Sequence, residues 1–342
     1  MGEPRIGVLG AGSIGCFCGG RLAALDADVV MVGRQRVRDE LSTSGLTTED
    51  MEGTSRKVPP ERVWFSTDPG VLEDRDVVFV CTKSAQTGEA GAALAKAFEG
   101  RRRVVVSLQN GVGNADVLRQ RLPDHEVLGG IVGFNVVSLG GGRFRRATTG
   151  PLVIERSRDP RARAAARMLS RAGFDVRQPR DVRPLQWSKL VMNLANAVSA
   201  LSGEPTQRIL SDGGYRRIVR AIMAEALEVM AAAGVRTARL GPLPVRLFPA
   251  ILALPTPAFR AVARAQLAID PEARSSMWED LDKRRLTEVD WLNGEIVRLA
   301  ERCGRRAPIA ARVVELVHEV EAACAGSPRL AADDLARALG VP

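Results

Sequence analysis

Short apolar runs separated by amphipathic stretches make up the first half of the chain. Runs of mainly valine and other apolar residues occupy positions 5–9, 28–32, 76–81 and 103–108. Runs of this length and composition are typical of strands buried on both faces of a parallel sheet. Small and apolar side chains at 14–25 have the spacing of a helix. The pattern predicts an α/β fold with a doubly wound parallel sheet.

The strand-like pattern continues to about residue 182. We expect an antiparallel extension of the sheet at residues 127–138, 143–148 and 151–155. Residues 159–172 then have a helical pattern, and residues 174–178 form a last strand. We assign residues 1–182 to one α/β domain.

Long helical runs replace this pattern after Pro184. Alanine-rich stretches such as 221–233 alternate with proline-rich breaks between residues 242 and 257. We assign residues 183–325 to an all-helical domain and residues 326–342 to a C-terminal tail.

Length and composition fit a globular protein of two domains. Of its 342 residues, 45% are hydrophobic and 26% are charged. No apolar run approaches the ~18 residues of a membrane span, and the N-terminus lacks the pattern of a secretory signal. The five cysteines lack C-x-x-C spacing. We expect a cytoplasmic protein with no metal site and no membrane partner.

Arginine dominates the basic residues. The net charge is +9, but the arginines are scattered among acids and aromatic residues make up only 4%, so we expect no nucleic-acid partner. Only five of the 49 basic residues are lysines. Because an ammonium group can give up a proton near neutral pH and a guanidinium cannot, each lysine is a candidate for chemistry.

A glycine-rich turn follows the first predicted strand and precedes a predicted helix. Its G-x-G-x-x-G pattern consists of Gly10, Ala11, Gly12, Ser13, Ile14 and Gly15. In dinucleotide-binding turns the three glycines permit the tight turn, the approach of the pyrophosphate and close helix packing. We therefore interpret residues 1–182 as a Rossmann-type domain. The alternative is a tight glycine turn without a ligand.

The residue after the second predicted strand bears on the choice of cofactor. NAD-binding domains usually have an acid there for the ribose hydroxyls, and this chain has Gly33 and Arg34. A guanidinium can pair with a 2′-phosphate, which favours NADPH. A solvated loop arginine is the alternative.

Two later strands end in polar loops at the edge where parallel sheets bind ligands. Lys83 and Gln86 follow the strand at 76–81, and Asn110 follows the strand at 103–108. We expect these side chains to face the cofactor or the substrate. For Asn110, ordinary turn chemistry before a glycine is the alternative.

One predicted helix in the second half carries polar residues on an apolar background. Residues 185–196 place Lys189, Asn193 and Asn196 within roughly 60° of one another around the helix axis. Buried amines and amides need each other or a ligand as partners. A polar seam between domains is the alternative to a ligand site.

Further polar candidates lie near residue 280. Ser276 and Glu279 fit a capping box, so Ser276 could cap a helix, and a helix N-terminus with a hydroxyl also suits a carboxylate ligand. Glu288 is either a solvated charge or an acceptor for a substrate hydroxyl.

Taken together, these segments resemble the ketopantoate reductase (2-dehydropantoate 2-reductase) family over nearly the whole chain. The resemblance rests on five segments in order, at residues 10–15, 81–86, 109–111, 187–193 and 275–290. It implies a Rossmann domain, an all-helical domain, and NADPH-dependent reduction of 2-dehydropantoate to (R)-pantoate on the pathway to pantothenate and coenzyme A. It implies catalytic roles for Lys189 and Glu288, substrate binding by Asn193 and Ser276, and cofactor-side roles for Lys83 and Asn110.

The sequence also departs from the family. Members often have a second asparagine eight residues after the lysine, where this chain has Ala197, with Asn196 one position earlier. The segment at 240–273 is longer and richer in proline. A reductase of the same fold that acts on another 2-oxo or 3-hydroxy acid is therefore the nearer alternative, and a non-catalytic NADPH-sensing protein is the alternative of another class. For the enzyme we expect a small 2-oxo acid as partner, and we leave a homodimer open.

Overall fold

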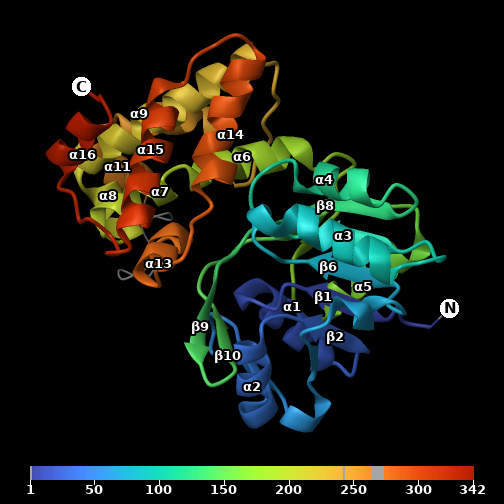
Figure 1. Ribbon diagram of the computed structural model, residues 1–342. Coiled ribbons are helices and arrows are strands. Elements are labelled where there is room, and N and C mark those ends of the chain that lie inside the picture. Colours follow the sequence, from blue (N-terminus) through green and yellow to red (C-terminus); the bar gives the residue numbers. More distant parts are fainter. Residues whose placement is uncertain (1, 242, 264–272) are drawn as a thin grey trace. The chain divides into compact units, whose positions relative to one another are not determined.

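The computed structural model describes residues 2–241, 243–263 and 273–342 and shows two compact units (Figure 1). Unit 1 is Met1–Val182 and unit 2 is Arg183–Pro342. Unit 1 is built on a mainly parallel sheet, and unit 2 consists of helices.

The main sheet of unit 1 has eight strands in the order β12-β11-β8-β7-β6-β1-β2-β5. Its strands are β1 (Ile6–Leu9), β2 (Val29–Val32), β5 (Trp64–Ser66), β6 (Val77–Val80), β7 (Val104–Ser107), β8 (Glu126–Val132), β11 (Leu152–Ile154) and β12 (Val176–Arg177). Strands β5, β2, β1, β6, β7 and β8 run parallel to their neighbours in this order. The parallel core of the predicted sheet is therefore present.

Helices cover both faces of this sheet. They are α1 (Ser13–Ala23), α2 (Gln35–Ser44), α3 (Thr87–Ala97), α4 (Asn114–Arg121) and α5 (Pro160–Arg171). One core cluster joins the sheet to apolar residues of α1 and α5, and the other joins it to those of α3 and α4. Since the central strands β1, β2, β6 and β7 are buried along their whole length, apolar residues fill nearly every position instead of every second one.

The expected antiparallel extension is only partly correct. β8 is parallel to β7, and β11 alone pairs antiparallel with β8. β9 (Val136–Gly140) and β10 (Arg143–Arg146) instead join a second sheet with β3 (Leu46–Glu49) and β4 (Ser55–Val58), in the order β4-β3-β10-β9. The chain leaves the main sheet at Gly133, whose N–H donates to the carbonyl of Pro151 at 2.8 Å. This small sheet packs on α1.

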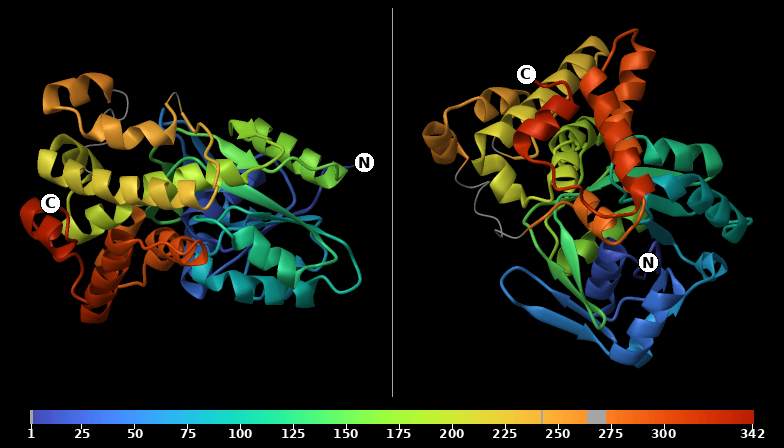
Figure 2. Two further views of the ribbon diagram at one scale, coloured as in Figure 1. Left: turned by 90° about the horizontal axis from the view of Figure 1, so that it is seen from above. Right: turned by 60° about the vertical axis from the view of Figure 1, so that its left-hand side comes forward.

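Unit 2 is organised around its longest described helix, α9 (Gly213–Ala232), drawn in yellow in the left view of Figure 2. Around it lie α6 (Arg183–Asn193), α7 (Asn196–Ser202), α8 (Thr206–Ser211), α10 (Phe248–Leu252), α11 (Thr256–Val262), α13 (Ser276–Asp282), α14 (Val289–Arg302), α15 (Pro308–Ala323) and α16 (Ala332–Ala338). The carboxylate of Glu225 on α9 accepts the N–H groups of Ile309 (2.9 Å) and Ala310 (2.8 Å) at the start of α15. This bond pair satisfies donors that a helix N-terminus leaves without intrahelical partners.

The C-terminal residues are part of unit 2, and the expected tail at 326–342 is wrong. They contain α16, which packs on α9 and buries Leu335 completely, while Val341 is only 7% exposed. The apolar residues of this segment have helical spacing, and their burial offsets the entropy cost of ordering the chain end.

None of the described helices is long and apolar enough to cross a membrane. The proline-rich segment at 240–273 is described in part, as α10 and α11, and its residues 264–272 lie outside the described structure.

Candidate active site

The glycine turn after β1 has geometry that a larger residue would disturb. Gly10 has a φ of +100°, and a Cβ on it would lie 2.5 Å from the backbone nitrogen of Thr82. A Cβ on Gly15 would lie 2.3 Å from the carbonyl oxygen of Gly10. Both distances are shorter than any ordinary contact, so β1 can lead directly into α1 only with glycine at these two positions.

The middle glycine of the turn faces open space. A Cβ on Gly12 would meet no atom of the described residues within 4 Å beyond its chain neighbours. Gly12 is the N-cap of α1, and no side chain caps this helix end. The first N–H groups of α1 therefore carry partial positive charge beside an accessible space. The residues of the turn fit the pyrophosphate of a dinucleotide.

Arg34 lies next to this turn. It is exposed, follows β2 directly and forms the N-cap of α2. A Cβ on its neighbour Gly33 would come 2.9 Å from the Cβ of Ala11, so the end of β2 packs against the glycine turn. An exposed guanidinium in this place can reach an anionic group on a nucleotide bound at the turn.

A buried hydrogen-bond network joins the loops after β6 and β7. The side chain of Asn114 donates to the carbonyl oxygen of Asn110 (2.6 Å) and to Ser84 Oγ (3.2 Å), and Ser84 Oγ donates to the same carbonyl (2.9 Å). Gln109 Nε2 donates to Thr87 Oγ1 at 2.8 Å. Hydrogen bonds from the side chains of each loop therefore stabilise the other loop.

This network positions the polar loop residues that the sequence indicates. Lys83 directly precedes the short 3-10 helix Ser84–Gln86, and Asn110 is half-buried at the end of β7. Sequence reasoning missed Thr87 and Asn114 as supports of these loops. Their signal is weak because a threonine and an asparagine near helix starts usually indicate capping alone.

In unit 2, Lys189 is the residue with the clearest sign of chemistry. It lies on α6, half-buried, and burial in the protein lowers the pKa of its ammonium group to about 8. The Glu288 carboxylate opposes this shift by favouring the charged form. Asn193 follows one helical turn later on α6, on the same side as Lys189.

The predicted continuous helix over 185–196 is wrong. α6 ends at Asn193, Leu194 and Ala195 form a turn, and Asn196 begins α7. The angular argument that places Asn196 beside Lys189 requires one unbroken helix, so it does not apply. The apolar pattern gives no sign of the break, because the buried Leu194 and Ala197 would also suit a continuous helix.

The cap of α13 is Ser275, so the alternative in which Ser276 caps this helix is wrong. Ser275 Oγ accepts the N–H of Trp278 (3.1 Å) and donates to the carbonyl oxygen of Asn196 (3.0 Å). Ser275 is only 7% exposed, whereas Ser276 is exposed on the first turn of α13. The cap therefore ties α13 to the start of α7 and leaves the hydroxyl of Ser276 for another use.

Glu288 is neither a fully solvated charge nor a residue inside a helix. It is the half-buried N-cap of α14, and its carbonyl oxygen accepts the N–H groups of Trp291 and Leu292, both at 3.1 Å. Thr287 fixes the approach to this cap, since its N–H donates to Glu321 Oε1 at 2.7 Å and its Oγ1 accepts the N–H of Val289 at 3.1 Å. The backbone that carries Glu288 is thus held on both sides.

Within the described residues, no group of three or more histidine, cysteine, aspartate and glutamate side chains is arranged to hold a metal ion. Unit 1 has the turn of a dinucleotide-binding domain, and unit 2 has an amine of lowered pKa near a carboxylate. These two features define a Rossmann-type, nicotinamide-dependent oxidoreductase.

Comparison with known proteins identifies the family. The family model described as ketopantoate reductase PanE/ApbA matches residues 6–159, and its C-terminal counterpart matches residues 181–321. The chain is 30% identical to the 2-dehydropantoate 2-reductase of Halobacterium salinarum over 92% of this chain and 97% of that protein. The chain belongs to the ketopantoate reductase family.

Solved structures agree with this assignment. A PanE/ApbA family ketopantoate reductase from Ralstonia eutropha JMP134 is 31% identical and matches with a TM-score of 0.79, over 94% of this chain and 99% of that one. A D-mandelate dehydrogenase, solved with NADH and anilino(oxo)acetate, has a TM-score of 0.75 at 21% identity and the same coverage. At that identity the second likeness shows a shared fold alone.

Proposed function

We propose that this protein reduces 2-dehydropantoate to (R)-pantoate with NADPH, a step toward pantothenate and coenzyme A. The relatives named 2-dehydropantoate 2-reductase, which cover nearly the whole chain at 26% to 30% identity, support this substrate. The observation that carries the chemistry is Lys189, whose pKa of about 8 fits a proton donor near neutral pH.

The cofactor would be held by residues of unit 1. The backbone of Gly10, Ala11, Gly12, Ser13, Ile14 and Gly15 would bind the pyrophosphate, and Arg34 the 2′-phosphate. Lys83, Gln86 and Asn110 would contact the cofactor from the two loops that the buried network joins. When bound, NADPH supplies the hydride that reduces the ketone carbon.

Lys189 would act on the ketone oxygen. As this oxygen gains negative charge, the ammonium group stabilises it electrostatically and then transfers its proton, which yields the hydroxyl of the product. Glu288 would keep the amine protonated at the start of each turnover, because a nearby negative charge favours the ammonium form. It would also accept a hydrogen bond from the distal hydroxyl of the substrate.

The remaining side chains would orient the substrate. The amides of Asn193 and Asn196 and, on the cofactor side, Asn110 can donate to substrate oxygens, and the exposed hydroxyl of Ser276 can donate to the carboxylate. Such contacts raise the rate by fixing the ketone in a reactive orientation.

The direct test supplies the purified protein with NADPH and 2-dehydropantoate and follows both cofactor oxidation and the chirality of the product. Stoichiometric formation of (R)-pantoate supports the proposal. NADPH binding without cofactor oxidation across a panel of oxo acids would instead favour an NADPH-sensing protein.

A second function is favoured by one observation. Ala197, where the family often has asparagine, is fully buried in α7 and has no polar group to offer a substrate. A reductase of the same fold acting on another 2-oxo acid would have different polar contacts there. A panel of oxo acids separates the two functions.

A further inference from the structure

A group of buried polar atoms in unit 1 has no hydrogen-bond partner. In the described part of the chain, eight buried side-chain nitrogen and oxygen atoms lack a partner, and four of them belong to Arg21, Thr48 and Arg56. They are Nε and Nη1 of Arg21, Oγ1 of Thr48 and Nη1 of Arg56. Burying a charged or polar group without partners is costly, and a bound acceptor would remove this cost.

These three side chains come from neighbouring elements. Thr48 on β3 pairs directly with Arg56 on β4, so both side chains lie on the same face of the small sheet. Arg21 lies in the last turn of α1, which packs on this sheet. A Cβ on Gly20 would come 3.0 Å from Thr48 Cγ2, which brings the end of α1 against Thr48.

Gly173, just after α5, marks the point where the two arginines meet. It has a φ of +94°, and the three nearest atoms to an added Cβ all belong to guanidinium groups. They are Arg21 Nη2 at 3.2 Å, Arg21 Cζ at 3.9 Å and Arg56 Nη2 at 3.9 Å. A side chain at this position would crowd the guanidinium group of Arg21, so the glycine allows the two arginines to converge here.

Charges of both signs surround this point. Arg146 on β10 adds a third guanidinium, stacked 4.4 Å from the ring centre of Phe134. Three acids oppose these cations: Asp50 Oδ2 lies 3.9 Å from Arg21 Nη2, beyond hydrogen-bond distance, and Glu52 and Asp175 are exposed. Burial, followed by the neighbouring Arg56, lowers the pKa of Arg21. The guanidinium of Arg21 is thus only partly compensated by the acids.

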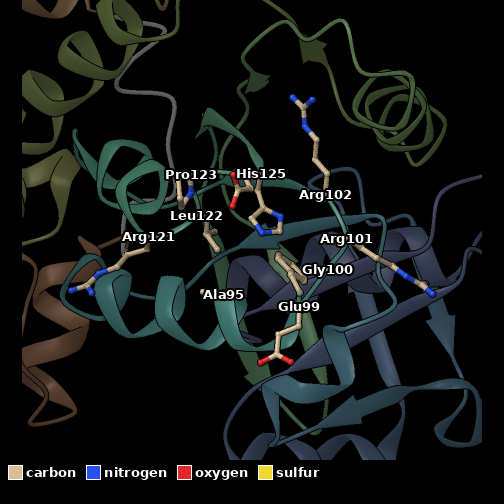
Figure 3. Close-up of a pocket in the computed structure, with 11 residues that line it drawn as sticks. Ala95, Glu99, Gly100, Arg101, Arg102, Arg121, Leu122, Pro123 and His125 are labelled. Carbon is tan, nitrogen blue, oxygen red and sulfur yellow. The ribbon is translucent and has the colours of Figure 1, made fainter.

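A second basic region in unit 1 does not have this arrangement (Figure 3). A hollow of about 410 Å³ near His125 is lined by Arg101, Arg102 and Arg121 among others. These arginines are exposed, and Figure 3 shows their side chains extending in different directions. Exposed guanidinium groups that point in different directions are already solvated by water, so they do not need a bound anion for stability.

We propose that Arg21, Thr48 and Arg56 form a binding site for the phosphate group of a small molecule or for free phosphate. Two guanidinium groups and a hydroxyl are donors suited to a tetrahedral oxyanion. The site is separate from the glycine turn, because Arg21 lies at the opposite end of α1 from Gly12. A bound anion would bridge α1 to the small sheet and raise the stability of the folded chain.

Thermal unfolding of the full chain tests this proposal, with phosphate compared to chloride at equal ionic strength. We expect Tm to rise with phosphate concentration and to level off at high phosphate. The variant Arg56→Gln should need at least a tenfold higher phosphate concentration for half of this rise. The matched control is Arg145→Gln on β10, an exposed arginine of the same sheet, which should keep the wild-type response. Thr48→Val, which removes only the hydroxyl, provides a second variant if Arg56→Gln does not fold.

Two further measurements identify the ligand and test whether the anion binds at the glycine turn instead. Glycerol 3-phosphate in place of inorganic phosphate distinguishes the sources: tighter binding of the ester supports a phosphorylated metabolite, and tighter binding of inorganic phosphate supports the free ion. Loss of the phosphate effect in Arg34→Ala, with an unchanged effect in Arg56→Gln and Thr48→Val, would place the anion at the glycine turn and overturn the proposal. Equal stabilisation by phosphate and chloride would overturn it as well, leaving water as the partner of these donors.

Discussion

The carboxylate of Glu288 opposes the effect of burial on the ammonium group of Lys189. Burial alone favours the neutral amine, and the negative charge at the N-cap of α14 restores part of the charged form, which leaves the pKa at about 8. An amine with this pKa is mostly protonated at neutral pH and still releases its proton readily. The pair therefore meets the requirement for an acid that works near pH 7.

The rate of reduction should depend on this pKa. In the proposed mechanism the protonated amine is the active form, so kcat/KM should be constant below pH 7 and fall as the pH rises through about 8. Glu288→Gln removes the charge that raises the pKa of Lys189, so the alkaline limb of the profile should move to lower pH. Rate profiles of both proteins from pH 5.5 to about 10 measure this shift.

A matched variant separates this effect from a general change of surface charge. Glu279→Gln on α13 removes a carboxylate that pairs with the exposed Lys283 and should leave the profile unchanged. Identical alkaline limbs in the wild type and Glu288→Gln would show that Glu288 does not set the pKa of the catalytic acid.

Removal of the amine should abolish most of the turnover. Lys189→Ala is expected to lower kcat by about 10²-fold or more, with NADPH affinity nearly unchanged, because the proposed mechanism has the amine act on the ketone oxygen. Steady-state kinetics and fluorescence titration of NADPH measure the two quantities. Lys283→Ala, which removes an exposed lysine of the same unit, is the control. Wild-type turnover in Lys189→Ala would exclude this residue from the chemistry.

Arg34 should distinguish the two nicotinamide cofactors. If its guanidinium pairs with the 2′-phosphate, Arg34→Ala should weaken NADPH binding by about 1.5 to 3 kcal/mol and leave NADH binding nearly unchanged. The exposed Arg36 on the same helix pairs with Glu40, so Arg36→Ala is a suitable control. Calorimetric titration measures the affinity of each variant for both cofactors. An equal loss of affinity for NADPH and NADH would show that Arg34 does not contact the 2′-phosphate.

The two adjacent serines of α13 should differ in their effects. Ser275→Ala removes a cap and a buried bond to the carbonyl of Asn196, and should lower the free energy of unfolding by about 1 to 2 kcal/mol. Ser276→Ala should change it by less than about 0.5 kcal/mol and raise KM for the oxo acid about tenfold. Urea unfolding and kinetics of both variants test this pair, and equal stability losses would contradict the assignment of the cap.

The main features of the fold follow from local patterns. Runs of apolar residues indicate strands buried on two faces. The glycine turn indicates that β1 leads directly into α1. The small sheet was not predictable because β10, which pairs locally with β9, also pairs with β3 almost a hundred residues away in the sequence. Their sequences carry no sign of which partner they choose, so tertiary packing decides.

The sequence predicts which residues form the candidate site, but it predicts their spatial arrangement only in part. Helical spacing correctly places Lys189 and Asn193 on one side of α6. It fails for Asn196, since the apolar positions of the segment fit one helix as well as two. It also fails to select Ser275 over Ser276, because the serines are adjacent in the sequence and are distinguished only by the folded structure, in which Ser275 bonds to Asn196 and Trp278.

The central claim is that this chain is a 2-dehydropantoate reductase that uses NADPH, and the most direct measurement is kcat/KM for a panel of 2-oxo acids with NADPH and with NADH. The account predicts that 2-dehydropantoate with NADPH exceeds every other combination at least tenfold. A preference of tenfold or more for another oxo acid, or for NADH, would contradict it.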